Sequence, residues 1–205
     1  MSNGRLSRQL ILDAAMELLD ERGAEGLTLR GLARRLGVTP MALYRHFDGK
    51  QELISAILDR ATAEIALPPA DLGPRDTLAA LAREIRRSVL RHAPLAPELL
   101  LHPSLGPSTH RLGERGNAAL EQAGLAGEDV WRGWNVIAMY ALGFAIVEAP
   151  RAWKQAADED STLTSRLSPP PPAELFSEAQ FEHGLQCVLS GVLDPHAVEK
   201  DPSSH

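Results

Sequence analysis

The 205-residue sequence predicts an all-α protein. Val and Ile together number only 15, and no stretch alternates apolar and polar residues for more than a few positions, as half-buried strands do. Apolar residues recur instead at intervals of three and four along most of the chain, which is the period of a helix. We therefore expect helices throughout, arranged in an N-terminal and a C-terminal domain.

Composition narrows the class of protein further. Hydrophobic residues make up 44% of the chain, enough for a substantial core, and the formal net charge is −6. The single cysteine, Cys187, excludes an intrachain disulfide and suits a reducing compartment. The sequence has no apolar run of 18 residues and no apolar N-terminal signal segment. We therefore expect a cytoplasmic protein with no membrane span.

The first two helices are short and close together. Apolar spacing predicts a helix over 7–22, and Gly23 is placed to end it. Thr28 is a favourable N-cap for a second helix, which Gly37 closes after about two turns.

Two further helices complete the N-terminal region. Thr39 and Pro40 open a very short third helix, because Thr caps well and Pro suits the first helical position. A fourth helix begins near Asp48, which we expect to cap it with Gln51 reaching back in a capping box. It fades before Pro68.

Four longer helices follow, separated by Pro-rich or polar segments. The segment 92–107 holds four prolines, so we expect it to be broken into short pieces. The predicted helices are 75–91, 108–123, 128–153 and 178–193. This pattern places a first domain at 5–65, a second at 75–194 and a disordered tail at 195–205.

The helix predicted at 128–153 is apolar nearly all round between 136 and 147. Such a helix must be covered on all sides, either by the core of its own subunit alone or by that core together with a second chain. We therefore expect a homodimer in which this helix and 178–193 form a four-helix bundle with their symmetry mates. The residues expected at the interface are Ile137, Val147, Phe181, Leu185, Val188, Leu189 and Val192.

Charge is distributed unevenly along the chain. The segment 27–50 carries five basic residues and one acidic residue, a net charge of +4, so the remaining 181 residues carry −10. A basic segment in an acidic protein indicates a specialised surface, such as one that meets nucleic acid, although a solvated helix face would look the same.

The two short helices joined by Gly37 and Val38 have the spacing of a helix-turn-helix. In that motif the first helix crosses the DNA backbone and the second enters the major groove. With Leu32, Leu36, Val38 and Leu43 packed inward, the residues left facing outward are Thr39, Met41, Ala42, Tyr44, Arg45 and His46.

The sequence GLTLRGLARRLGVTPMALYRHFDGK, at 26–50, closely resembles the DNA-binding signature of TetR-type transcriptional regulators, and the likeness extends over 7–61. The resemblance implies an all-helical homodimer. Each subunit would have an N-terminal three-helix DNA-binding domain that contains the helix-turn-helix, and a C-terminal ligand-binding and dimerisation domain. The resemblance also implies that Lys50 holds a phosphate. The DNA-binding residues expected together are Thr28, Arg30, Thr39, Pro40, Met41, Ala42, Tyr44, Arg45, His46 and Lys50.

The C-terminal half is similar to the tetracycline repressor branch. The likeness lies in VLRH at 89–92, in His102 before a Pro-rich break, and in FEHGLQCVLSG at 181–191. It implies that His102 helps bind the magnesium carried by a drug. Ala66 stands where that branch has a drug-contacting histidine, which argues against tetracycline itself. The candidate ligand-binding residues are Leu99, His102, Trp131, Trp134, Met139, Tyr140 and Phe144.

These observations predict a ligand-responsive repressor that binds a palindromic double-stranded DNA operator as a dimer and is released by a small hydrophobic effector. No enzymatic motif is present, and we expect no cofactor and no metal site. Two other classes stay open. One is a helical adaptor whose basic segment binds an acidic partner. The other is a metal-dependent enzyme that uses His92, His102 and His110, whose spacing matches no signature.

Overall fold

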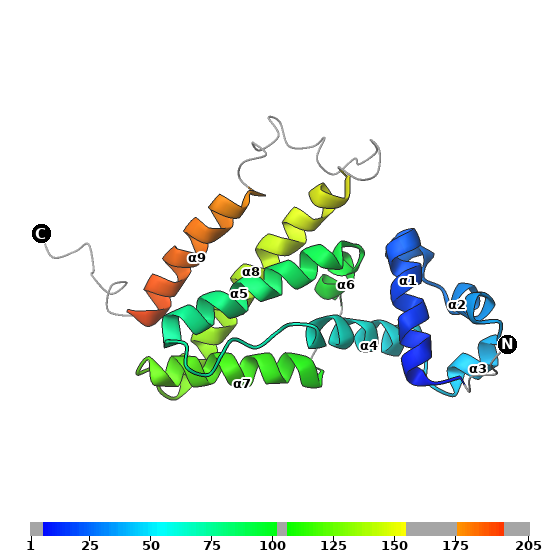
Figure 1. The fold of residues 1–205 in the computed structure, drawn as a ribbon, viewed down its shortest axis with the longest axis horizontal. Helices are drawn as coiled ribbons and strands as arrows, with labels where there is room; N and C mark the ends of the chain where they lie inside the picture. The colour runs from blue at the N-terminus through cyan, green and yellow to red at the C-terminus, as the bar shows by residue number, and fades with distance from the viewer. Residues whose placement is uncertain (1–5, 102–105, 155–175, 195–205) are drawn as a thin grey trace, which may run out of the picture.

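The structure is a computed structural model that describes residues 6–101, 106–154 and 176–194. These residues contain no β-strand, which confirms the predicted all-α class (Figure 1). The elements are α1 (Arg8–Gly26), α2 (Leu29–Leu36), α3 (Pro40–Tyr44), α4 (Lys50–Ala63), α5 (Pro74–Arg91), the 3-10 helix η1 (Ala93–Leu95), α6 (Ala96–Leu101), α7 (Pro107–Gln122), α8 (Glu128–Lys154) and α9 (Glu178–Leu193).

Helices α1 to α3 form one end of the molecule (Figure 1). Their core contains Ile11, Leu32, Leu43 and Phe47, each no more than 1% exposed. Burial of each such side chain contributes about 1.5–3 kcal/mol, which compensates for the small number of hydrogen bonds that helices of five and eight residues can make.

The turn between α2 and α3 has the expected chemistry. The Thr28 hydroxyl accepts a hydrogen bond from the Gly31 amide at 3.0 Å, which caps α2. Gly37 has φ +66°, a left-handed conformation that favours glycine, and its amide donates to the last carbonyls of α2. The chain therefore leaves α2 sharply enough to start α3 one residue after Thr39.

Two predicted helix ends differ in detail. Helix α1 does not stop at Gly23: that residue has non-helical backbone (φ 68°, ψ 179°), and one more helical turn follows to Gly26. At the start of α4 the N-cap is Gly49 rather than Asp48, and no cap side-chain bond forms. The Asp48 amide instead donates to the Glu52 carboxylate at 2.6 Å, so Glu52 takes the part expected of Gln51.

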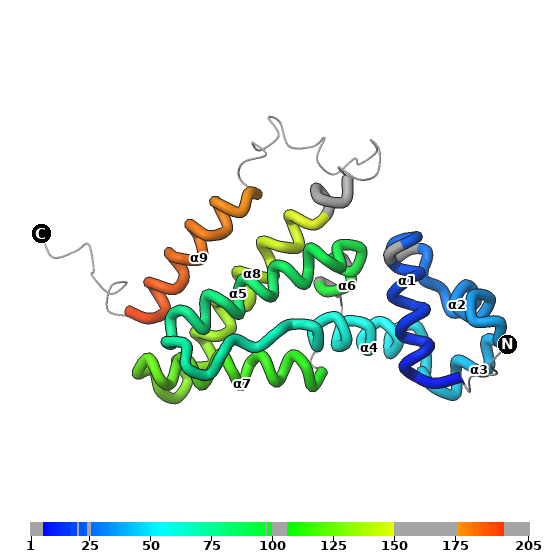
Figure 2. The backbone as a smooth tube through the Cα atoms, viewed as in Figure 1, coloured from blue at the N-terminus to red at the C-terminus, as the bar shows by residue number. Residues whose placement is uncertain are grey.

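Helix α4 joins the two ends of the molecule (Figures 1 and 2). It contributes Leu53, Ile57 and Leu58 to the N-terminal core. The chain after α4 lies against α7. The Arg111 guanidinium donates to the carbonyls of Ala63 and Ile65 at 3.2 and 3.3 Å.

Helices α5, α7, α8 and α9 form the larger body, with a core that includes Leu78, Leu81, Ile137 and Leu185. Two bidentate ion pairs tie α5 to its neighbours. Arg86 binds Glu148 of α8 at 2.8 and 2.7 Å, and Arg83 binds Glu182 of α9 at 2.7 Å through both oxygens.

Helix α8 is unusually apolar. Its segment Glu128–Ala149 is long and apolar enough to cross a membrane by length and composition alone, although it contains no uninterrupted apolar run of 18 residues. In the structure, Ile137, Ala141 and Ala145 are fully buried within the chain. The core helix of a soluble domain passes the same test, so composition alone does not place α8 in a bilayer.

Candidate DNA-binding surface and internal pocket

The third helix presents its side chains largely to solvent. Leu43 is fully buried and anchors α3, whereas Met41 is 72% exposed and Tyr44 is 48% exposed. Of the ten residues predicted to meet DNA, Ala42 and His46 are half-buried. The other eight are exposed: Thr28, Arg30, Thr39, Pro40, Met41, Tyr44, Arg45 and Lys50. A five-residue helix with one buried anchor and an exposed aromatic–basic edge has the shape of a groove-reading element.

The basic segment is less positive in three dimensions than along the chain. Arg35 of α2 binds Glu17 and Glu21 of α1 at 2.9 and 2.7 Å. Its hydrogen bond to Glu21 lowers the pKa of that carboxyl, and both carboxylates raise the pKa of the guanidinium. Among the residues that the structure describes, Arg30, Arg34, Arg45 and Lys50 have no ion-pair partner. These four carry the positive charge of the surface.

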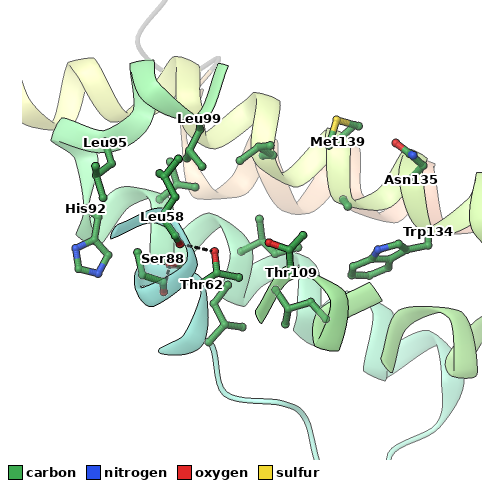
Figure 3. A pocket seen from close by; sticks show the side chains of 17 residues that line it. Leu58, Thr62, Ser88, His92, Leu95, Leu99, Thr109, Trp134, Asn135 and Met139 are labelled. Carbon is green, nitrogen blue, oxygen red and sulfur yellow. Dashed lines mark hydrogen bonds between the residues drawn. The ribbon is translucent and has the colours of Figure 1, made fainter. Parts of the chain in front are cut away.

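A cavity of about 340 Å³ lies where α4 meets the larger body (Figure 3). Helices α4, α5, α6, α7 and α8 all contribute to its wall, together with η1. The lining residues are Leu58, Ala61, Thr62, Ile65, Ile85, Ser88, Val89, His92, Leu95, Leu99, Thr109, Leu112, Trp134, Asn135, Ala138, Met139 and Leu142. Within the described chain, this lining contains no Asp, Glu, Lys or Arg.

Three polar side chains of the cavity are engaged with the protein. The Ser88 hydroxyl donates to the Ala61 carbonyl at 3.2 Å, and the Thr62 hydroxyl donates to the Leu58 carbonyl at 2.8 Å. His92 lies 3.1 Å from the Glu64 carboxylate through Nε2. Burial acts to raise the pKa of Glu64, but the neighbouring His92 and Arg91 lower it on balance. An occupant would therefore meet walls that are mostly apolar, with the polar side chains of Thr109 and Asn135 among them.

The structure sorts the predicted pocket residues by helix face. Leu99, Trp134 and Met139 line the cavity, and Trp134 and Met139 belong to the α8 part of its wall (Figure 3). His102 lies outside the described residues. The prediction is corrected for three residues that do not line the cavity: Trp131, Tyr140 and Phe144.

Each of those three residues has a physical reason for its position. Trp131 is 53% exposed on α8. The Tyr140 hydroxyl donates to the Phe181 carbonyl of α9 at 2.9 Å. The Phe144 ring packs edge-on against the Phe181 ring, with 5.4 Å between the two ring centroids. Tyr140 and Phe144 therefore join α8 to α9 on the side away from the cavity.

Sequence reasoning missed five polar lining residues as ligand contacts: Thr62, Ser88, His92, Thr109 and Asn135. The sequence feature that could have identified one of them as a pocket residue is the position of Ser88 among the inward-facing residues of α5. His92 was considered only as a metal ligand with His102 and His110. In the structure His92 and His110 have separate carboxylate partners, Glu64 and Glu114.

The predicted dimer residues lie on several faces. Ile137, Phe181, Leu185 and Leu189 are fully buried in the subunit's own core, so their assignment to a surface between chains is corrected. Val188 and Val192 also pack against that core while remaining half-buried. Val147 is 50% exposed, as is Val136 on the same face of α8. The apolar pattern of both helices is thus satisfied largely within one chain.

Comparisons with known proteins agree with this architecture. The profile described as "Bacterial regulatory proteins, tetR family" matches residues 11–57, and that described as "Tetracyclin repressor-like, C-terminal domain" matches residues 68–195. An HTH-type transcriptional regulator from Saccharopolyspora erythraea is 30% identical over 200 residues, covering 91% of this chain and 84% of the relative. The class A tetracycline repressor protein of transposon 1721, from Escherichia coli, is 31% identical over 201 residues, covering 92% and 91%.

A solved structure shows the same fold. The crystal structure of BioQ from Mycobacterium smegmatis superposes with a TM-score of 0.76 at 29% identity, covering 92% of this chain and 98% of that one. BioQ has also been solved with its double-stranded DNA operator, and that structure gives a TM-score of 0.71 at 28% identity, covering 92% and 99%. Matches to both halves of the chain, together with the helix-turn-helix and the internal cavity, lead to one conclusion. This chain belongs to the TetR family of bacterial transcriptional regulators and is a ligand-responsive DNA-binding protein.

Proposed function

We propose that the protein is a cytoplasmic repressor that binds a palindromic operator as a two-fold dimer and leaves it when an uncharged apolar effector enters the cavity. The observation that carries this proposal is the position of α4. Lys50 begins α4 six residues after the end of α3, whereas Leu58, Ala61 and Thr62 of the same helix form part of the cavity wall.

The proposed DNA contacts divide by chemistry. Tyr44, Arg45 and Thr39 reach base edges in the major groove, because Tyr44 is exposed on α3 and the other two are exposed at its two caps. Arg30, at the start of α2, and Lys50, at the start of α4, hold phosphates. The remaining predicted residues are Thr28, which caps α2, and Pro40, Met41, Ala42 and His46, which shape the groove-facing surface.

The proposed dimer surface is the outward face of α8 with the neighbouring face of α9. Val136 and Val147 are each half exposed there, and a Cβ added at Gly143 between them would meet no other atom within 4 Å. A second copy of the chain would cover these apolar side chains and allow close approach at the glycine. Two recognition helices would then reach half-sites about one DNA turn apart, ~34–36 Å.

The proposed effector is a small, mostly apolar molecule that contacts Leu99, Trp134 and Met139. The mostly apolar lining without Asp, Glu, Lys or Arg supports this class, since an ion would lose hydration there without gaining an oppositely charged side chain of these types. His102 stays a candidate contact on the strength of the resemblance alone.

The response would be transmitted through α4. Its Asp59 carboxylate accepts a hydrogen bond from the Ser108 amide of α7 at 2.9 Å, and its last residues bind α5 and α7 through Ser88 and Arg111. An occupant that moves these neighbours would move α4 and alter the distance between recognition helices. Switching the population from 1:99 to 99:1 requires about 5.5 kcal/mol of differential binding.

Selection from random double-stranded DNA, followed by fluorescence anisotropy, tests the proposal. The protein should enrich a palindrome, and an uncharged aromatic probe such as 1-naphthol should weaken binding to it more than the anion 1-naphthoate does. Enrichment of a non-palindromic site would contradict the dimer. Equal effects of the two probes, or a stronger effect of the anion, would contradict the proposed effector class.

A further inference from the structure

Arg8, in the first turn of α1, contacts the end of the recognition helix. One guanidinium nitrogen donates to the His46 carbonyl at 2.5 Å, immediately after α3. The guanidinium also lies 4.1 Å from the centroid of the Phe47 ring, whose side chain is buried in the N-terminal core. These contacts connect residues 38 and 39 positions apart in the sequence.

Glu52 completes the arrangement from the first turn of α4. Its Oε1 accepts from the second guanidinium nitrogen of Arg8 at 2.8 Å, and its Oε2 accepts from the Asp48 amide at 2.6 Å. The Asp48 amide and the Arg8 guanidinium together lower the pKa of the Glu52 carboxyl, so it is ionised at neutral pH. Arg8 and Glu52 thus bind both sides of the turn 46–48 that joins α3 to α4.

Helix α3 depends on such contacts because it has few of its own. It contains five residues, its N-cap Thr39 makes no side-chain cap bond, and Leu43 is its only buried residue. A helix this short cannot set its own direction, so the direction of Tyr44 and Arg45 depends on how the turn after α3 is held.

We propose that Arg8 and Glu52 form a clamp on the turn 46–48 that positions the recognition helix for operator reading. Both are positioning residues that act through the backbone of His46 and Asp48, and neither is required to touch DNA. A guanidinium near a DNA-binding surface would ordinarily be assigned a phosphate contact. The two roles make opposite predictions for the carboxylate.

Glu52→Ala separates the two roles by the sign of its effect. Removing a negative charge near DNA raises affinity for any sequence if electrostatics alone matters. If Glu52 positions α3, the same change lowers affinity for the operator by about tenfold or more, which is the loss typical of one mismatched base pair. Affinity for a scrambled duplex should then stay nearly unchanged. Glu52→Gln, which keeps an acceptor for the Asp48 amide, should recover part of the loss.

Asp13→Ala is the matched control, because Asp13 forms the analogous ion pair with Arg60 between α1 and α4 at 2.6 Å. It removes the same charge from the same domain without touching the turn, so operator affinity should hold or rise slightly. The operator would be one selected with the wild-type chain, so a failure to select any sequence would count against operator binding itself.

Arg8→Met and Arg8→Lys supply the second arm, measured by anisotropy over a salt series with thermal melts of each variant. The clamp predicts that both variants lose operator affinity with an unchanged salt slope, because Lys cannot bind Glu52 and the His46 carbonyl in a fork. Higher operator affinity for Glu52→Ala overturns the proposal. So does a salt slope lowered by about one in Arg8→Met with full retention in Arg8→Lys.

Discussion

Tyr44 combines exposure with position in a way that no other aromatic residue of the N-terminal domain does in the described chain. It is 48% exposed on α3, whereas Phe47, three residues later, is 1% exposed and serves the core. Tyr44 is therefore available to a groove and Phe47 is not, although both lie in the same aromatic–basic stretch of sequence.

We expect Tyr44→Ala to weaken operator binding by about 1–3 kcal/mol while leaving the melting temperature nearly unchanged, because an exposed side chain contributes little to folding. Anisotropy and thermal melts measure the two effects. Phe47→Ala is the contrasting variant and should destabilise the fold by about 3–5 kcal/mol. Unaltered operator affinity in Tyr44→Ala would show that Tyr44 does not read DNA.

Lys50 differs from Tyr44 in what it is expected to recognise. It is exposed at the first position of α4, where helix amides and a lysine side chain together suit a phosphate. Lys50→Ala should weaken binding to operator and scrambled DNA alike and reduce the salt slope by about one. A change in base preference measured by repeated selection, with no change in slope, would refute the phosphate contact.

At the scale of elements, two ion pairs join α5 to α8 and to α9. Arg86 and Glu148 are 12% and 15% exposed, and the guanidinium also lies 5.0 Å from the centroid of the Phe181 ring of α9. Arg83 and Glu182, one turn away, form the same bidentate pair but are 38% and 32% exposed. The two ion pairs therefore have the same bidentate geometry and differ in how far their side chains are exposed to water.

We expect Glu148→Ala to lower the free energy of unfolding by about 2–4 kcal/mol, somewhat below the ~3–5 kcal/mol of a fully buried pair, because it strands Arg86. Glu182→Ala should cost no more than ~1 kcal/mol, since water screens and replaces its partner. Urea unfolding at neutral pH measures both. Equal losses in the two variants would mean that burial does not control the strength of these pairs.

At the scale of the whole molecule, the outward face of α8 exposes several large apolar side chains within the described residues. Met139, Val136 and Val147 are 55%, 50% and 50% exposed there. Because Met139 also lines the cavity, the proposed dimer surface and the effector pocket lie on adjoining faces of one helix.

Val136→Asp should shift the protein toward monomer in sedimentation velocity and weaken operator binding, because two linked half-site contacts become independent. Leu67→Asp, which places the same charge at a residue 39% exposed after α4, is the control and should remain dimeric. If Val136→Asp stays dimeric at low concentration, the subunits join through another surface.

Several residues show how far sequence reasoning reached. Thr28 and Gly37 were predicted to begin and end α2, and they do so because caps and left-handed glycines act within a few residues. Ile137 and Phe181 are apolar residues at helical spacing, and a residue at a dimer interface would show the same pattern in the sequence. Only the packing of α8 against α5 and α9 shows that both are buried within one chain.

The sequence by itself determined the all-α class, the helix-turn-helix and most of its exposed residues, because helical period, caps and turns are local properties. The tertiary structure alone decided which side of α8 faces the cavity, that Arg35 is neutralised by α1, and that Arg8 and Glu52 hold the end of α3. The ion pairs among these contacts join residues that lie 14 to 44 positions apart in the sequence. No local pattern encodes such pairings, since they arise only when separate helices pack their faces together.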